Sequence, residues 1–150
     1  MSDTVFIPPD RQMRRRGVFI PPLLILSFVV YLVVGFVFFG GRPEGWENQL
    51  FTVPMVSGIQ WGISAGDLII TLSLLLLFFE ILKSTRTGTA SVLEHMVSTL
   101  VFVVFLIAFI LLGACSSSVF FILMLMSLVD VVAGFSVSIT SAGRDVTMAP

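Results

Sequence analysis

The sequence contains few charged residues, a single cysteine and a single histidine. Asp, Glu, Lys and Arg make up only 11% of its 150 residues, against about 25% in an ordinary soluble domain. One cysteine, Cys115, cannot form a disulfide within the chain, which also excludes a thiol oxidase built on cysteine pairs. One histidine, His95, cannot supply a bis-histidine haem site or, with one cysteine, a Cys/His zinc site. We therefore expect neither a cofactor nor a metal.

Long apolar stretches take the place of the missing charge. Hydrophobic residues make up 57% of the chain, and about 20 consecutive apolar residues can cross a bilayer as a helix. The pattern predicts an all-α integral membrane protein, a four-helix transmembrane bundle that forms one domain over residues 18–138. Its predicted spans are residues 18–39, 65–82, 92–112 and 119–138. The first run is too long for the apolar core of a signal peptide, so we expect it to be retained.

Basic residues flank these spans unevenly. Residues 1–17 form a basic head, with Arg14, Arg15 and Arg16 just before the first span, and residues 139–150 form a short polar tail. If the spans alternate in direction, seven of the eight Lys and Arg residues lie on one side of the membrane. The positive-inside rule then places the head, the tail and both termini in the cytoplasm. The three arginines would anchor this topology and contact anionic lipid.

The start of the second span carries a capping pattern. Ser64 is followed three residues later by Asp67, which is typical of a capping box. Asp67 then marks a helix start at the outer membrane interface, with Trp61 as an aromatic anchor.

The same pattern recurs at the start of the third span. Ser91 is followed by Glu94 at the same spacing, which predicts a helix start at the cytoplasmic face. Glu80 and Lys83, three residues apart at the end of the preceding span, can pair with each other or extend to the interface.

Asp130 is the acid that helix capping does not explain. It lies about 16 Å into the fourth predicted span, where a charge costs at least about 2.5 kcal/mol. No Lys or Arg lies within a predicted span. Asp130 should therefore be protonated, hydrogen-bonded inside the bundle or matched by another subunit. Estimated depths and helix faces predict a set of polar neighbours for it: Ser27, Ser73, Thr99 and Ser127.

Two functions remain open. An acid inside the membrane favours a small proton- or cation-coupled transporter that uses Asp130. An acid that holds helices together, or docks another membrane protein, favours a non-enzymatic accessory or scaffold subunit, which is our leading interpretation. Small four-helix multidrug exporters are excluded, because they carry an essential glutamate in the first helix and this first span contains no acid.

An enzyme is not expected, because the chain lacks the paired Cys, His or carboxylate groups that common mechanisms need. The expected partners are the lipid bilayer and either a second copy of the chain or a larger membrane complex. No nucleic acid is expected.

The central block WGISAGDLIITLSLLLLFFEILKSTRTGTASVLEH resembles a group of small, uncharacterised four-span proteins of the bacterial inner membrane. The resemblance covers residues 60–138 and rests on the SAGD turn, the FFEILKSTR helix end and the surroundings of Asp130. It implies a multi-pass protein of the bacterial inner (plasma) membrane. It implies no activity and no catalytic residue.

Overall fold

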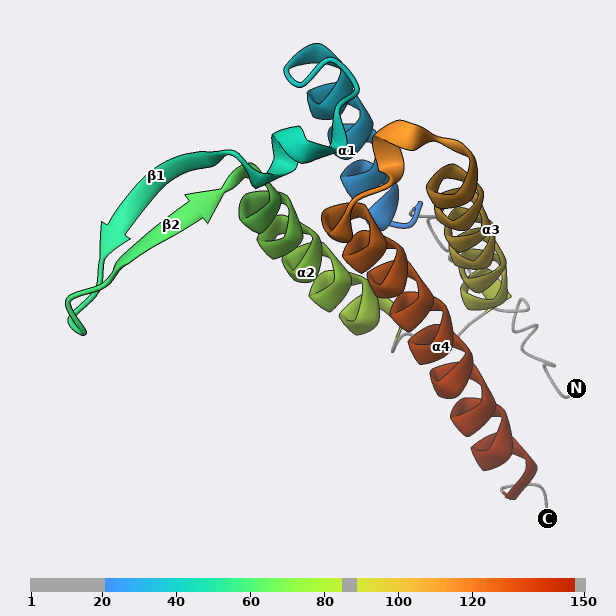
Figure 1. Ribbon diagram of the computed structural model, residues 1–150. Coiled ribbons are helices and arrows are strands. Elements are labelled where there is room, and N and C mark those ends of the chain that lie inside the picture. Colours follow the sequence, from blue (N-terminus) through green and yellow to red (C-terminus); the bar gives the residue numbers. More distant parts are fainter. Residues whose placement is uncertain (1–20, 85–88, 148–150) are drawn as a thin grey trace, which may run out of the picture.

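Helices make up most of the computed structural model, which describes residues 21–84 and 89–147 (Figure 1). The predicted basic head, residues 1–17 with Arg14, Arg15 and Arg16, lies outside these ranges. Within them the elements are, in chain order, α1 (Leu24–Val37), the 3-10 helix η1 (Pro43–Glu47), β1 (Gln49–Pro54), β2 (Gln60–Ser64), α2 (Ala65–Ser84), α3 (Thr89–Leu111), the 3-10 helix η2 (Gly113–Cys115) and α4 (Ser118–Thr147). Three of these helices, α2, α3 and α4, are long and apolar enough to cross a membrane.

Helix α1 is shorter than the predicted first span. Its 14 residues extend about 21 Å, less than the roughly 30 Å of a hydrocarbon core. The helix begins after Pro21 and Pro22, which lack the N–H group that a helix interior requires. It ends before Gly40 and Gly41, whose φ angles of 61° and 75° turn the chain out of the helix. Only part of the prediction over 18–39 is therefore seen as helix, and residues 18–20 lie outside the described residues.

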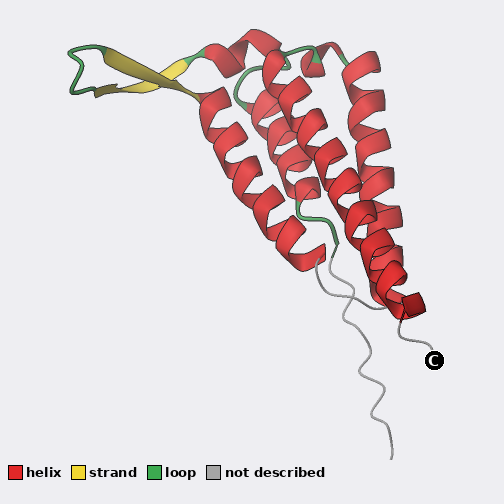
Figure 2. Cartoon of the chain, turned by 90° about the horizontal axis from the view of Figure 1, so that it is seen from below, coloured by secondary structure: helices red, strands yellow, loops and turns green. Residues whose placement is uncertain are grey.

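The four helices lie side by side (Figures 1 and 2). Helix α4 packs against both α2 and α3, and α1 packs mainly against α2. The start of α1 lies beside the end of α2, because the Leu23 N–H donates a hydrogen bond to the Glu80 carboxylate. The elements η1 and η2 contact each other at the opposite end. The molecule therefore has two distinct ends, one with polar contacts and one with an aromatic core.

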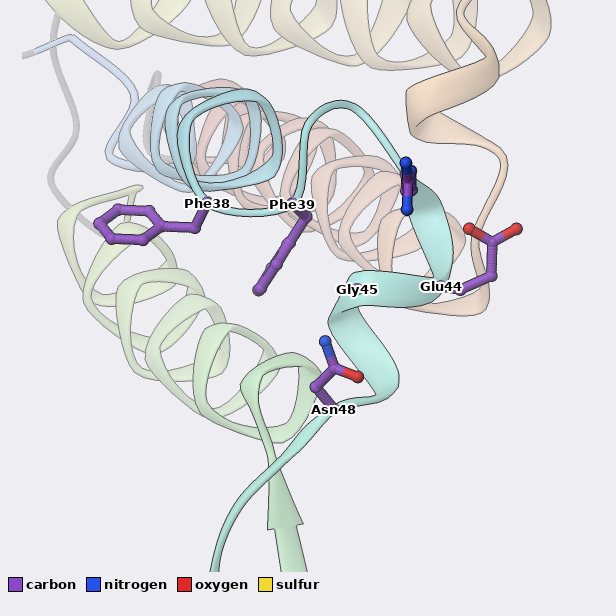
Figure 3. A pocket seen from close by; sticks show the side chains of 6 residues that line it. Phe38, Phe39, Glu44, Gly45 and Asn48 are labelled. Atoms are coloured by element: carbon purple, nitrogen blue, oxygen red, sulfur yellow. The ribbon is translucent and has the colours of Figure 1, made fainter.

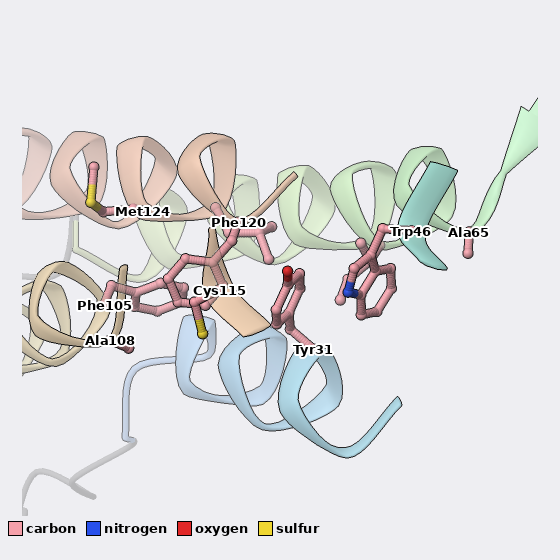
Figure 4. Close-up of a cluster of buried hydrophobic side chains, with 10 residues drawn as sticks. Tyr31, Trp46, Ala65, Phe105, Ala108, Cys115, Phe120 and Met124 are labelled. Atoms are coloured by element: carbon pink, nitrogen blue, oxygen red, sulfur yellow. The ribbon is translucent and has the colours of Figure 1, made fainter. Parts of the chain in front are cut away.

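The aromatic core joins η1 and the η2 loop to the helices (Figure 4). Tyr31 of α1 stacks on Trp46 of η1 with ring centroids 4.5 Å apart, and meets Phe120 of α4 edge-on at 4.8 Å. The Tyr31 hydroxyl donates to the Ala114 carbonyl at 3.0 Å and lies 2.8 Å from the Ser117 hydroxyl. All three rings are buried. Since a buried aromatic pair adds about 0.5–1.5 kcal/mol beyond area burial, this cluster holds η1 firmly against the helices.

Strands β1 and β2 form an antiparallel hairpin that we did not predict. The all-α prediction is therefore incomplete, since a two-stranded sheet connects η1 to α2. In the turn, the Met55 N–H donates to the Ile59 carbonyl at 2.9 Å, and Gly58 adopts a φ of 82°. Pro54 and Gly58 favour a loop, but the surrounding Phe, Val, Thr, Ile and Trp residues favour extended strands. The hairpin projects sideways from the start of α2 (Figures 1 and 2).

Besides those of α1, two helix boundaries differ from the predicted spans by three residues or more. Helix α3 begins at Thr89, so Ser91 lies inside its first turn and is not the residue that precedes the helix. No proline or glycine separates the two residues, so nothing prevents the earlier start. Helix α4 continues to Thr147, which makes most of the predicted tail helical. There the Thr140 hydroxyl donates to the Ser136 carbonyl at 2.8 Å, which satisfies the side chain within the helix.

Candidate functional site

Charged side chains gather between the packed helices, at the end of the molecule where α1 begins and α2 ends. Glu80 is only 3% exposed, and its two carboxylate oxygens have different partners. Oε1 lies 2.7 Å from Lys83 Nζ, one turn further along α2. Oε2 accepts the hydrogen bond from the Leu23 N–H at 2.9 Å. The first N–H groups of a helix have no carbonyl partner within it, so Glu80 satisfies one of them while joining α1 to α2.

Lys83 points toward the helices and is paired twice. Besides Glu80, its Nζ lies 3.9 Å from Oε2 of Glu94 on α3, and the Lys83 and Glu94 side chains are 13% and 15% exposed. Of the two arrangements expected for Glu80 and Lys83, the structure contains the pair. Glu94 does not lie in the first turn of α3, which contains no acid. Because the helix begins earlier than predicted, Glu94 faces Lys83 and does not cap the helix.

Asp130 of α4 lies beside the same charges. It is 5% exposed, its side-chain hydrogen-bond partner is Ser98 of α3, and Glu80 and Lys83 are close enough to act on it electrostatically. Of the three states expected for Asp130, the structure contains the hydrogen bond inside the bundle. Lys83 lies just after the predicted second span. Because α2 packs against α4, the Lys83 ammonium group acts electrostatically on Asp130. We refer to Glu80, Lys83, Glu94, Ser98 and Asp130 as the Lys83 cluster.

Ser98 is the member of the cluster that sequence reasoning missed. It is 6% exposed, and the same helix also buries Phe105 and Ala108. The spacing from Glu94 to Ser98, Phe105 and Ala108 follows steps of three and four residues or their sums, as expected for one face of a helix. Tracing that face from Glu94 would have found Ser98, whereas matching depths alone selected its neighbour Thr99.

His95 packs next to the cluster, between α3 and α4. Its side chain is 6% exposed, and its ring centroid lies 6.2 Å from that of Phe135. A Cβ atom added at Gly134 would overlap the imidazole. The missing side chain at Gly134 therefore allows α4 to approach His95 closely, which is the role that small residues have in membrane helix packing.

The four predicted neighbours of Asp130 have other hydrogen-bond partners. The Ser27 and Ser73 hydroxyls lie 2.8 Å apart and are fully buried, so they join α1 to α2. Ser73 Oγ also lies 2.7 Å from the Ile69 carbonyl oxygen. A hydroxyl has one proton to donate, so when Ser73 donates to this carbonyl, the Ser27 hydroxyl can donate to Ser73. Ser127 donates to the Met124 carbonyl at 2.7 Å, and Thr99 donates to the His95 carbonyl at 2.9 Å. Each of these last two hydroxyls is thus satisfied by its own helix.

Ser64 and Asp67 form a reciprocal pair at the start of α2. The Ser64 N–H and hydroxyl each donate to Asp67 Oδ2 at 2.8 Å, and the Asp67 N–H donates back to Ser64 Oγ at 3.1 Å. These are the hydrogen bonds of a capping box. Trp61 precedes this pair on β2 and is 54% exposed. Ser91, on α3, has a side chain outside the described part of the structure.

A surface hollow lies at the opposite end of the molecule from the Lys83 cluster (Figure 3). Its lining residues come from the end of α1 and from η1: Phe38, Phe39, Arg42, Glu44, Gly45 and Asn48. None of them belongs to the cluster, and Arg42 and Glu44 are exposed. The hollow is therefore separate from the buried charges.

The cluster combines three carboxyl groups with one ammonium group, and of these Glu80 and Asp130 are buried while Lys83 and Glu94 are partly exposed. Such a site can hold the helices together, or it can bind and release a proton. Among residues 21–84 and 89–147, no group of three or more His, Cys, Asp and Glu residues is arranged to hold a metal ion. The chain matches no protein-family model, no curated protein and no solved structure.

Proposed function

We propose that this protein is a non-enzymatic accessory or scaffold subunit of a membrane assembly in the bacterial inner membrane. The observation that carries the proposal is that the buried polar side chains are hydrogen-bonded within the molecule. In the described part of the chain, every buried side-chain nitrogen or oxygen has a hydrogen-bond partner. Glu80 and Lys83 add contacts between α1, α2 and α3. A buried network that is fully satisfied makes helix positions specific and rigid, which suits a protein that presents fixed surfaces to others.

The outer face of α3 supports the same proposal. This helix packs mainly against α4, and its apolar side chains remain uncovered along its length. Leu100 is 64% exposed, Ile107 50% and Ile110 68%. In a bilayer such a face contacts either lipid or another helix. It is available to a second copy of the chain or to a larger membrane complex.

The test is photo-crosslinking at native expression. A photoreactive phenylalanine analogue replaces Leu100 on the outer face of α3, and the same analogue replaces the fully buried Phe105 as the matched control. The expected result is a discrete larger protein adduct from position 100 that is absent at position 105. Equivalent outward positions are Leu75 on α2 and Val132 on α4. If all three yield lipid adducts alone, and the solubilised protein runs as a monomer without a partner, the proposal fails.

The proposal includes four spans with both termini in the cytoplasm. The contact of Leu23 with Glu80 aligns the start of α1 with the end of α2, as expected for neighbouring antiparallel spans. The sequence just before α1, residues 18–23, is also apolar. The uneven distribution of Lys and Arg supports the orientation.

Labelling with a membrane-impermeant maleimide tests this topology. Cysteine replaces Ser57 in the hairpin turn or Thr147 at the end of α4. In intact cells, Ser57→Cys should react and Thr147→Cys should react only after the membrane is opened. The buried Cys115 of the unchanged chain serves as the background control. Reaction of Thr147→Cys in intact cells would reverse the proposed orientation.

A second candidate is proton- or cation-coupled transport through Asp130. It is favoured by one observation, the contact of Asp130 with Ser98 beside the buried Glu80 and the half-buried Lys83. Asp130→Asn should then abolish a flux driven by a pH gradient in proteoliposomes, while Asp67→Asn, at the helix start, should leave it unchanged. Equal fluxes from both variants and the unchanged protein would eliminate this candidate.

A further inference from the structure

The register of the hairpin separates its side chains into two unlike faces. Side chains alternate along a strand, and directly paired residues share a face. Phe51 pairs with Ile63 and Val53 pairs with Trp61, so one face is entirely apolar. Thr52 pairs with Gly62, and Pro54 pairs with Gln60, so apart from Pro54 the other face is polar or has no side chain. We refer to these as the apolar face and the polar face of the hairpin.

The polar face gains a further polar group from Gln49. A Cβ added at Gly62 would overlap the Gln49 amide, so this amide lies over the glycine. On the apolar face, Phe51 is 49% exposed and Trp61 is 54% exposed. The molecule itself therefore leaves much of the apolar face uncovered. Apolar groups exposed to water do not stabilise a two-stranded hairpin, and an exposed apolar patch is typical of a surface that contacts something else.

The base of the hairpin is held in place by the bundle. Trp46, just before β1, is 2% exposed in the aromatic core. The Ala65 N–H at the start of α2 donates to the Asn48 carbonyl at 3.2 Å. From this base the hairpin extends sideways and does not continue the direction of the helices (Figures 1 and 2). If α2, α3 and α4 cross a bilayer, the hairpin lies along its surface at the level where α2 begins.

We propose that the β1–β2 hairpin is a lipid-binding arm that lies in the headgroup region of the bilayer, with its apolar face toward the acyl chains and its polar face toward water. Residues 48–64 contain no charged residue, which fits the uncharged boundary between headgroups and acyl chains and requires no particular lipid charge. Trp61 belongs to the residue type that is enriched at this depth. Helix α2 then continues the apolar surface into the membrane, since Leu68 and Leu72 are exposed on its first turns.

The position of the apolar face favours lipid over a protein partner. The apolar face lies on an element that extends sideways from the helices, and it is continuous in sequence with α2, on which Leu68, Leu72 and Leu75 are exposed. The same amphipathic arrangement lets interfacial helices bind a membrane surface by burying one face. This inference depends on the membrane insertion of the helices and not on the accessory function proposed above.

Site-directed spin labelling of the full chain in phosphatidylcholine nanodiscs tests the arm. Single cysteines replace Val53 and Thr52, neighbours on opposite faces, in a Cys115→Ala background, and each carries a nitroxide. The label at position 53 should be accessible mainly to oxygen, which concentrates in lipid, and the label at position 52 mainly to a water-soluble nickel complex. The ratio of the two accessibilities should differ several-fold between these neighbours, and Phe51→Cys and Gln60→Cys should repeat the alternation.

Two results would overturn the proposal. Equal and high accessibility to nickel at both positions would place the hairpin in water. Protection of position 53 from both reagents would mean that protein covers the apolar face. Tryptophan fluorescence adds an independent measurement. Phosphatidylcholine brominated near the headgroup should quench the emission of Trp61, which is identified as the part of the signal that the Trp61→Phe variant lacks. Absence of such quenching would also overturn the proposal.

Discussion

Gly134 of α4 lies directly against the imidazole of His95 on α3, in a space that a Cβ atom would have to share with the ring. Both residues are buried, so neither can move into lipid or water to relieve an overlap. The contact sets how closely α3 and α4 approach near the Lys83 cluster.

Gly134→Ala should therefore destabilise the protein. Overpacking a buried contact costs about 1–3 kcal/mol, because the ring or the helix must shift. The measurement is the free energy of unfolding in mixed micelles. Gly113→Ala is the matched control, since an added Cβ there meets no atom within 4 Å. Equal stability of the two variants would show that the imidazole moves without cost.

Lys83→Met should destabilise the protein by about 3 kcal/mol, because it leaves Glu80 buried without its cation. The double variant Glu80→Gln, Lys83→Met should regain much of this loss, since glutamine can still accept the hydrogen bond of the Leu23 N–H. The two unfolding free energies test the pair as a unit. If the double variant is as unstable as the sum of the two single variants, Glu80 and Lys83 act independently.

The Cys115 thiol should react slowly and with a shifted pH dependence. Burial raises its pKa from about 9 to about 11. At pH 8 the thiolate fraction is then about 100-fold below that of an ordinary cysteine, and only the thiolate is nucleophilic. Alkylation by iodoacetamide in the folded protein should keep rising up to about pH 11. A plateau near pH 9 would show that the thiol is open to water.

The same shift predicts how stability depends on pH. A raised pKa favours the thiol form in the folded state. The contribution of Cys115 to the free energy of unfolding is therefore complete below about pH 9 and is lost as the pH rises to about 11. Cys115→Ala should remove this part of the pH dependence while leaving the rest of the profile in place. An unchanged slope between these pH values in the variant would assign the loss to other groups.

Asp67→Ala should weaken the start of α2 by about 1 kcal/mol, the usual effect of losing a capping residue. The Ser64 N–H loses its acceptor, which lies at 2.8 Å. Thr71→Ala is the control, because the exposed Thr71 hydroxyl donates only to a carbonyl of its own helix. Hydrogen exchange of the first turn of α2 locates the effect. Equal protection in both variants would mean that tertiary contacts, and not the capping box, hold this helix end.

The parts of the fold that were predicted correctly depend on neighbours in the sequence. Helices long and apolar enough to cross a membrane were expected, and α2, α3 and α4 have these properties. The start of α2 follows from Ser64 and Asp67, which lie within one turn of each other. The hairpin was missed because Pro54 and Gly58 resemble loop signals at short range, while strand pairing depends on residues further apart.

The candidate site depended on contacts that no local pattern contains. Ser27 and Ser73 were expected at one level and do meet, but Thr99 and Ser127 bond to their own helices. Depth along a helix can be counted from the sequence, whereas the rotation of each helix about its axis cannot. Rotation decides which side chain faces a neighbour, and it selected Ser98 over Thr99 for Asp130.

By itself, the sequence determined that this chain forms apolar helices and where α2 starts. It also determined that one cysteine and one histidine are too few for a disulfide within the chain or for a Cys/His zinc site. These properties follow from composition, run length and contacts within a single turn. Only the tertiary structure decided that Lys83 turns inward to meet Glu80 and Glu94, and that the hairpin has one apolar face. Both depend on how separate segments pack and pair, because the energy of a charge or an apolar face is set by whatever the fold places beside it.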